Sequence, residues 1–244
     1  MFDDLSQVKR RYEELAYRMT TPEAMNDPAA YAAMMREYKE LTPLVEAYRS
    51  YTALQKEVDE AKALVKSRLS EKRYKHTINV KKMAVKLAKR YGADEEKAAL
   101  AALLHDSAKE LPKAEMLQIF ADNAIIAKNA AKRPAPVWHG YAASILCQTQ
   151  WGVTDPEILS AIECHTTGKQ NMSLLDKIIY MADMTSAERD YPGVEALRAE
   201  EMQNLDLALR HALEQSIAFV REKGNPLDPD TVAALDDARA ACTR

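Results

Sequence analysis

The sequence has 244 residues, of which 47% are hydrophobic and 29% charged, with only 6 Gly, 10 Pro and 3 Cys. The hydrophobic fraction is too high for a disordered chain, and glycine and proline are too scarce for a low-complexity one. The three cysteines form no Cys-x-x-Cys pair, which excludes a disulfide framework and argues against a cysteine-based zinc site. No 18-residue apolar run occurs, so no membrane span is expected. Without a signal-peptide pattern, the protein is expected in the cytoplasm.

The net charge of −3 hides a segregation of charge along the chain. Residues 66–92 carry ten Lys and Arg against one Glu, whereas residues 1–65 sum to −3 and residues 93–244 to −9. A block this basic could attract a polyanion, and it is equally consistent with a solvated helix face. Nucleic acid is not favoured as a partner, because neither interleaved aromatic residues nor a nucleic-acid motif accompanies the charge.

The first 65 residues show helical periodicity. A helix is predicted over residues 4–19 and a second long helical stretch over residues 28–67, with breaks at Pro22 and Pro28. The apolar positions of the second stretch keep a coiled-coil-like repeat. We therefore expect residues 1–65 to form a long helical-hairpin or coiled-coil arm, with a protein partner or a second copy of the chain along its apolar stripe.

From residue 69 onward, helix start and stop signals follow one another closely. They predict helices over residues 70–91, 94–107, 112–121, 137–151, 155–166, 173–189 and 194–223, then a loop over 225–231 and a terminal helical turn. No alternation typical of strands occurs. We therefore expect an all-α chain in which a helical bundle, residues 66–244, follows the arm.

Four of the five histidines and one aspartate fall on apolar helical stripes: His76, His105, His139, His165 and Asp183. A lone histidine on such a stripe is more often a hydrogen-bonded core residue, and a lone aspartate is more often an ion-pair partner. Five such positions in one small domain favour a metal site, because a buried carboxylate is costly unless it is paired or metal-bound. Imidazole and carboxylate ligands suit Fe, Mn or Zn, and the adjacent Asp106 can add a ligand from the same helix end as His105.

The order His76, His105-Asp106, Asp183 resembles the signature of the HD superfamily of metal-dependent phosphohydrolases. The sequence segments around these residues are more specific than the order of the His and Asp residues alone. As a set, residues 73–77, 104–109, 138–140, 164–168, 179–183, 189–194 and 226–231 resemble the bacterial symmetrical dinucleoside tetraphosphatases of the YqeK type. This resemblance covers about residues 67–238.

The resemblance implies an HD-domain helical bundle that hydrolyses diadenosine tetraphosphate symmetrically to two ADP by a metal-activated hydroxide. The metal would be divalent or mixed-valent, one or two ions, typically Fe, with Mn, Zn or others as alternatives. His76, His105, Asp106 and Asp183 would bind the core metal, and His139 and His165 would hold a second metal or the phosphates. Asp106 and Lys109 would be catalytic. Substrate contacts are expected from Arg73, Asn79, Lys109, His139, His165, Thr166 and Arg189, and from the loop Pro226, Leu227, Asp228, Pro229, Asp230 and Thr231.

One segment of this domain departs from the pattern of the tetraphosphatase family, and one cysteine allows a second interpretation. Thr185-Ser186-Ala187 stand where the family often has an Ile-Glu-Pro run, which affects the expected substrate contacts there but not the metal ligands. Cys164 lies beside His165 and could be read as a nucleophile, yet no basic partner accompanies it in any family pattern. We expect a buried structural thiol instead.

Residues 1–63 resemble a different family. The segments 1–5, 11–15, 27–28 and 38–48 are similar to the first helical domain of bacterial class-1 peptide chain release factors. No Gly-Gly-Gln occurs anywhere, so peptide release is not expected. The arm could dimerise the chain, dock a translation partner, or have no role. Two alternatives to the tetraphosphatase activity therefore stay open: hydrolysis of another nucleoside polyphosphate, and a translation-associated interaction protein that works through its arm.

Overall fold

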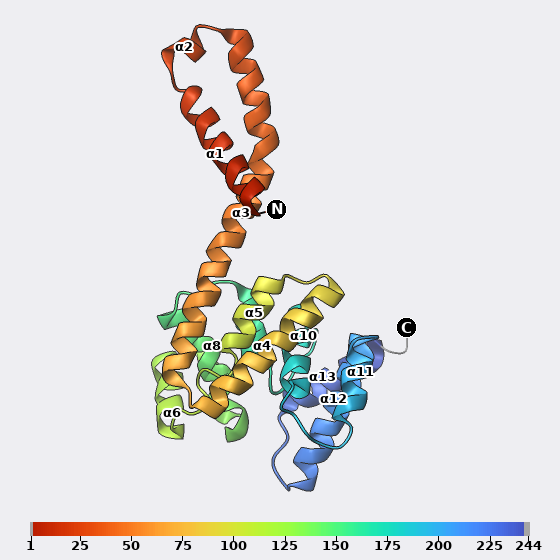
Figure 1. The fold of residues 1–244 in the computed structure, drawn as a ribbon. Helices are drawn as coiled ribbons and strands as arrows, with labels where there is room; N and C mark the ends of the chain where they lie inside the picture. Colours follow the sequence, from red (N-terminus) through yellow and green to blue (C-terminus); the bar gives the residue numbers. More distant parts are fainter. Residues whose placement is uncertain (1, 242–244) are drawn as a thin grey trace. The chain divides into compact units, whose positions relative to one another are not determined.

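The computed structural model describes residues 2–241, with side chains from residue 5 onward (Figure 1). Over this range the chain consists of helices and connecting turns, which confirms the predicted all-α class. It divides into two compact units, Met1–Glu57 and Val58–Arg244, within the long helix α3 (Pro28–Arg68). The functional boundary predicted at residues 65 and 66 lies later in the same helix and stays a prediction. None of the described helices is long and apolar enough to cross a membrane.

The first unit is a helical hairpin. Helix α1 (Phe2–Arg18) and the short α2 (Pro22–Met25) lead into α3, and α1 runs beside the start of α3 in the opposite direction (Figure 1). The two helices are joined by the stacked rings of Tyr12 and Tyr38, whose hydroxyls lie 2.6 Å apart. Leu15 and Val45 are buried. This hairpin is the arm that the periodicity predicts.

Five helices build the core of the second unit: α4 (Glu71–Tyr91), α5 (Glu95–Leu104), α8 (Trp138–Gln150), α9 (Pro156–Cys164) and α10 (Leu174–Thr185). Helix α4 packs on α5 and α10, while α9 packs on α5, α8 and α10. Side chains at the predicted starts, Ser70, Asp94, Asp155 and Ser173, accept hydrogen bonds from the first-turn backbone N–H groups. Local capping chemistry therefore sets where these four helices begin.

Shorter elements surround this core. Helices α6 (Lys113–Asp122) and α7 (Ala124–Ala127), with two 3-10 turns, η1 (Ala130–Lys132) and η2 (Ala135–Val137), pack against α8. At the C-terminal end, α11 (Val194–Glu201) and α13 (Pro229–Ala241) both pack on α12 (Leu205–Glu222). Helix α12 packs on α10, so these last three helices add a further layer to the core next to α10.

Four helix boundaries differ from the sequence prediction by more than two residues. The single helix expected up to residue 223 is broken between α11 and α12, because the Asn204 side chain accepts the Leu207 N–H and starts a new helix. The terminal helical turn is the full helix α13, which begins at Pro229, so Pro229, Asp230 and Thr231 belong to a helix and not to the expected loop. Proline suits a first helical turn, where its missing N–H costs nothing. Helices α5 and α10 end earlier than predicted, at Leu104 and Thr185.

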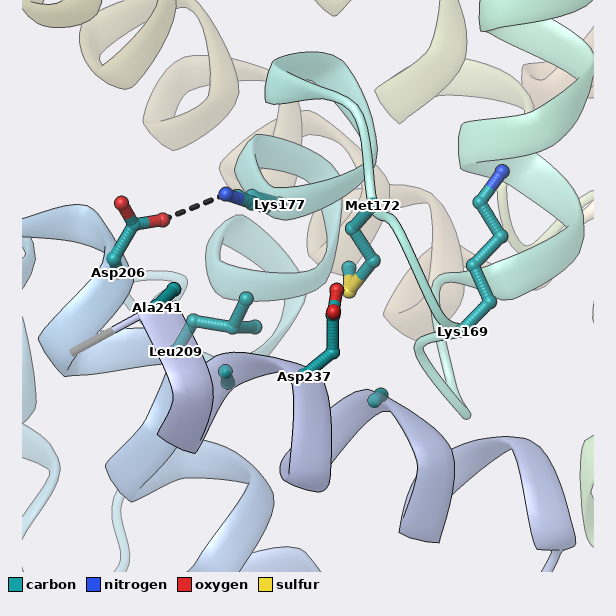
Figure 2. A pocket seen from close by; sticks show the side chains of 9 residues that line it. Lys169, Met172, Lys177, Asp206, Leu209, Asp237 and Ala241 are labelled. Atoms are coloured by element: carbon teal, nitrogen blue, oxygen red, sulfur yellow. Dashed lines mark hydrogen bonds and ion pairs between the residues drawn. The ribbon is translucent and has the colours of Figure 1, made fainter. Parts of the chain in front are cut away.

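Figure 2 shows the place where the segment before α10 and the helices α10, α12 and α13 meet around a small gap. Lys177 on α10 forms an ion pair with Asp206 on α12 at 2.7 Å, and Met172 and Leu209 supply apolar walls. The gap has a volume of about 20 Å³, which is room for about one water molecule. It is a packing gap between helices, far too small for a nucleotide.

Candidate metal centre and active site

Five helices bring the six predicted metal-binding residues together. Helix α4 carries His76, the end of α5 carries His105 and Asp106, α8 begins with Trp138-His139, His165 follows α9, and Asp183 lies in the last turn of α10. The four histidines and Asp106 are buried, with residue exposures between 0% and 7%. The apolar-stripe argument therefore placed the four histidines correctly in the interior, whereas Asp183, which it also named, is only partly buried.

Two of the imidazoles are oriented by the ends of their own helices. His105 and His165 are the C-cap residues of α5 and α9, and each Nδ1 lies 2.7 Å from a carbonyl oxygen three residues earlier, of Ala102 and Ile162. The last carbonyls of a helix lack intrahelical partners, so they are free to accept these bonds. With the proton on Nδ1, each Nε2 is left as a lone-pair donor that faces the cluster.

A close approach between α8 and α9 brings His139 beside His165. A Cβ at Gly140 would lie 2.7 Å from the carbonyl oxygen of Glu163, so only glycine allows this helix spacing. The two Nε2 atoms of His139 and His165 are 3.1 Å apart. Because of Gly140, two histidines from separate helices can therefore face one carboxylate.

Asp106 lies at the centre of the cluster and faces two sets of nitrogens. Its Oδ2 lies 3.6 Å from His76 Nε2 and 3.7 Å from His105 Nε2, while its Oδ1 lies 3.3 Å from His139 Nε2 and 3.5 Å from His165 Nε2. On the first side, His76 Nε2 is also 3.1 Å from Asp183 Oδ1. The carboxylate can therefore serve ligand groups on both of its sides.

The cluster contains buried polar atoms without hydrogen-bond partners. His76 Nε2, His105 Nε2 and Asp106 Oδ1 are all in this state. Leaving such atoms unsatisfied costs about 1–3 kcal/mol each. Two ligand groups are close enough to hold an ion, namely His76 with His105 and Asp183, and His105 with Asp106 and His165. Since all the donors are imidazole nitrogens and carboxylate oxygens, the residues fit a divalent metal ion.

The pKa values of two of the imidazoles agree with this assignment, whereas, against the opposing effect of burial, the carboxylates of Asp183 and Glu188 raise the pKa of His76. Burial lowers the pKa of His105 to about 4, and burial together with the neighbouring His165 lowers the pKa of His139 well below its ordinary value. For Asp183, burial opposes ionisation, but the close contact with His76 and the charge of Arg189 hold its pKa below the ordinary value. Neutral imidazoles and an ionised carboxylate are the forms that bind metals.

Three cationic side chains border the cluster. Lys109 Nζ lies 2.9 Å from His139 Nε2 and 3.8 Å from Asp106 Oδ1, and burial lowers the pKa of this lysine. Arg73 Nη1 lies 3.4 Å from Asp106 Oδ2, and Arg189 Nη2 lies 2.5 Å from Asp183 Oδ1. A positive edge of this kind beside buried carboxylates suits a polyphosphate.

The remaining predicted substrate residues lie in different surroundings. Thr166 follows His165 and its hydroxyl is buried without a partner. Asn79 donates through Nδ2 to Glu188 Oε2 at 2.7 Å, so its amide is already engaged. No sequence pattern predicted Glu188 as a site residue, because it lies in a turn outside any apolar periodicity. Its position five residues after Asp183 was the available signal.

The segment from Pro226 to Thr231 is tied to another part of the second unit. Arg133 binds Asp228 at 2.6 Å and Asp230 at 2.7 Å. Within the described residues, no hydrogen bond or ion pair is recorded between this segment and the His/Asp cluster. A pocket of about 680 Å³ is lined by Pro226, Leu227 and Pro229 together with Asn129, Lys132, Arg133 and Pro134.

Cys164 is buried beside His165, and burial raises the pKa of its thiol well above the ordinary value. A thiol in this state is a poor nucleophile. The surroundings thus agree with the expected structural role.

Comparison with known proteins agrees with both resemblances. The HD domain family matches residues 73–188, and the PCRF domain family matches residues 8–126. A peptide chain release factor 1 from Geobacillus sp. (strain WCH70) is 38% identical over 69 residues, which are 28% of this chain and 19% of the factor. The chain thus shares only a small part of the length of that factor.

Similarity to the hydrolases is much more extensive. The symmetrical bis(5'-nucleosyl)-tetraphosphatase of Bacillus subtilis (strain 168) is 42% identical over 173 residues, which are 71% of this chain and 92% of that enzyme. The crystal structure of an HD superfamily hydrolase from Clostridium acetobutylicum, described as involved in NAD metabolism, superposes with a TM-score of 0.71 at 38% identity. It covers 75% of this chain and 97% of its own. The chain therefore belongs to the family of symmetrical bis(5'-nucleosyl)-tetraphosphatases that contain an HD domain.

Proposed function

We propose that the chain hydrolyses diadenosine tetraphosphate symmetrically to two ADP. The observation that carries this proposal is the buried Asp106, with imidazoles on both of its sides and the cations of Lys109 and Arg73 beside it. The activity for which the tetraphosphatase relatives are named supplies the substrate class. Water adds across the central P–O–P bridge, so one ADP gains the water oxygen and the other gains a proton.

In this proposal His76, His105, Asp106 and Asp183 hold the first metal ion, and His139 and His165 hold a second ion or the phosphates. A bound divalent ion lowers the pKa of coordinated water and polarises phosphoryl oxygens. Iron is the ion expected from the resemblance, and manganese and zinc suit the same ligands. Metal analysis of protein purified without added metal identifies the ion.

The chain's own residues bind and orient the polyphosphate. Lys109, Arg73 and Arg189 neutralise phosphate charge, and the charge on the departing ADP is met by Lys109, whose ammonium lies against His139. The hydroxyl of Thr166 is free to donate to a phosphate oxygen. We assign one nucleoside to the pocket beside Pro226, Leu227 and Pro229, where Arg133 holds Asp228 and Asp230, and Thr231 follows in α13.

The direct test is hydrolysis of diadenosine tetraphosphate by the purified protein with Fe²⁺ or Mn²⁺ in ¹⁸O-labelled water. We expect ADP as the sole product, with one ¹⁸O in half of the ADP molecules. Formation of ATP and AMP would contradict the symmetrical reaction. Faster turnover of another nucleoside polyphosphate in a substrate panel would favour the alternative substrate.

For the N-terminal unit we propose a role as a surface for a protein partner or a second copy of the chain. Its similarity to part of the release factors supports this assignment. Residues 1–65 produced alone should capture that partner, and size-exclusion chromatography of the full chain tests dimerisation. The cytoplasmic location stays a prediction of the sequence.

A further inference from the structure

Among the described residues, Glu188 is the one acidic side chain that contacts His76 from outside the cluster of predicted metal-binding residues. Its Oε1 is hydrogen-bonded to Nδ1 of His76 and also accepts the hydroxyl of Ser186 at 2.7 Å. Its Oε2 accepts the Asn79 amide at 2.7 Å. Three side chains from α4 and from the turn after α10 therefore converge on a single carboxylate.

His76 needs such a partner because of its place in the fold. His105 and His165 end their helices, and their Nδ1 atoms use free carbonyls of the same helix. His76 lies inside α4, where the preceding carbonyls already accept helical hydrogen bonds. Its Nδ1 must therefore find an acceptor elsewhere, and Glu188 supplies it.

The consequence is a defined tautomer of His76 for metal binding. With Nδ1 donating to Glu188, Nε2 is the ring atom left to bind an ion, and it lies 3.1 Å from Asp183 Oδ1 and 3.6 Å from Asp106 Oδ2. Carboxylates that accept the second ring N–H of a metal-binding histidine orient the ring and raise its basicity. Loss of such a partner costs about 10- to 100-fold in metal affinity.

The local sequence supports a specific role for this residue. Ser186 lies two residues before Glu188 in the turn after α10 and donates its hydroxyl to Glu188 Oε1 at 2.7 Å. The amide of Asn79, expected to contact the nucleotide, holds the other carboxylate oxygen. Both neighbours therefore restrain Glu188 and leave it aligned with the histidine.

We infer that Glu188 is a positioning residue that fixes the ring and tautomer of His76 for metal binding, with Asn79 and Ser186 holding the carboxylate in place. This inference rests on the proposed metal site and extends it to residues that do not touch the ion. It reassigns Asn79 from nucleotide contact to support of the metal centre.

The test measures Mn²⁺ affinity of the full chain by competition with a chelator, without substrate. We expect E188A to bind Mn²⁺ about 10- to 100-fold more weakly than the wild type. E188Q, which keeps an acceptor oxygen but no charge, should fall between the two, and N79A should weaken binding less than E188A. The matched control is E200A, because Glu200 accepts from Nδ1 of His211 at 2.7 Å in the same way, away from the cluster. E200A should bind like the wild type.

A second measurement reads the histidine directly. Long-range ¹H–¹⁵N spectra of the metal-free protein should show the proton of His76 on Nδ1, and E188A should redistribute it while His105 and His165 keep theirs. Wild-type Mn²⁺ affinity and an unchanged His76 tautomer in folded E188A would overturn the inference while leaving the hydrolase assignment intact. A wild-type protein that binds Mn²⁺ with the expected dependence on Glu188 but cleaves no dinucleotide would overturn the proposed function alone.

Discussion

The two units of the chain differ in where they place charged side chains: an ion pair of the first unit is exposed, whereas a central carboxylate of the second is buried. In the first unit, Arg11 binds Glu37 at 2.7 Å, and both side chains are 41% exposed. In the second unit, the Asp106 side chain is 3% exposed, and its Oδ1 has no hydrogen-bond partner. Exposed ion pairs contribute about 0.2–1 kcal/mol, whereas an unsatisfied buried group is costly. The comparison indicates that the second unit gives up stability at the place where it performs chemistry.

Substitution of Asp106 should have the largest effect among the variants that test this difference between the two units. D106N should lose bound metal and reduce the hydrolysis rate by about 10³-fold or more, because the carboxylate faces ligands on both sides. The metal-free variant should unfold at the same temperature as the metal-free wild type or higher, since a buried charge is removed. Metal analysis, product assays and thermal unfolding measure the three effects. A D106N protein that keeps its metal and its activity would break the comparison.

Replacement of Lys109 should separate charge neutralisation from metal binding. K109M should lower kcat on diadenosine tetraphosphate by about 10²-fold, as expected when one stabilising donor is removed. The metal content should stay unchanged, because Lys109 borders the cluster without ligating it. Steady-state kinetics combined with metal analysis test this, and K109R provides the conservative control. Equal loss of metal and activity would place Lys109 in the structural support of the centre.

Glu201 extends the comparison to a buried carboxyl away from the metal centre. It is fully buried, and burial raises its pKa to about 7 against the opposing effects of the Thr185 hydrogen bond, Lys86 and Arg198. The Thr185 hydroxyl lies 2.7 Å from the Met181 carbonyl and 2.9 Å from Glu201 Oε2. One hydroxyl hydrogen satisfies only one of these acceptors, so both contacts are hydrogen bonds only when Glu201 is protonated and donates, while its Oε1 has no partner.

Stability should therefore depend on pH through Glu201. The unfolded chain releases this proton near pH 4.5 and the folded chain near pH 7, so the stabilisation is present below pH 4.5 and is lost as the pH rises toward 7. E201Q, which stays neutral, should be more stable than the wild type at pH 8 by about 2 kcal/mol and should flatten the pH dependence. Urea unfolding at pH 5 and pH 8 measures this. An identical pH profile in both proteins would show that Glu201 is ionised throughout.

The smallest effect is expected in the first unit. R11Q should leave the unfolding temperature almost unchanged, because the pairs of Arg11 with Glu37 and Glu14 are exposed and screened by salt. Hydrolysis kinetics should be unchanged. Thermal unfolding of the full chain at low and high salt, with parallel activity assays, provides the measurement. A large loss of activity in R11Q would mean that the first unit contributes to catalysis.

The sequence predicted those features that depend on local chemistry. Helix starts at Ser70, Asp94, Asp155 and Ser173 follow from capping, and the buried histidines follow from their apolar neighbours. The break before α12 was missed because an apolar pattern continues through it, while the decisive interaction is the side-chain cap at Asn204.

The missed part of the site has a similar explanation. Glu188 meets His76 across 112 positions of sequence, and no periodicity links a turn residue to the middle of a distant helix. The same holds for the pairing of Arg133 with Asp228. Such contacts depend on how the helices pack, which the sequence pattern alone does not specify.

The close spacing of α8 and α9 at Gly140 limits how far the metal-binding side chains on these two helices can move apart. A methyl group at this position would meet the Glu163 carbonyl at 2.7 Å, so the two helices would have to separate. Metal coordination tolerates displacements of only about 0.2 Å, whereas a helical core can absorb a shift of that size by small adjustments. The absence of a side chain at Gly140 therefore sets the distance between these two helices, and with it the distance between His139 and His165.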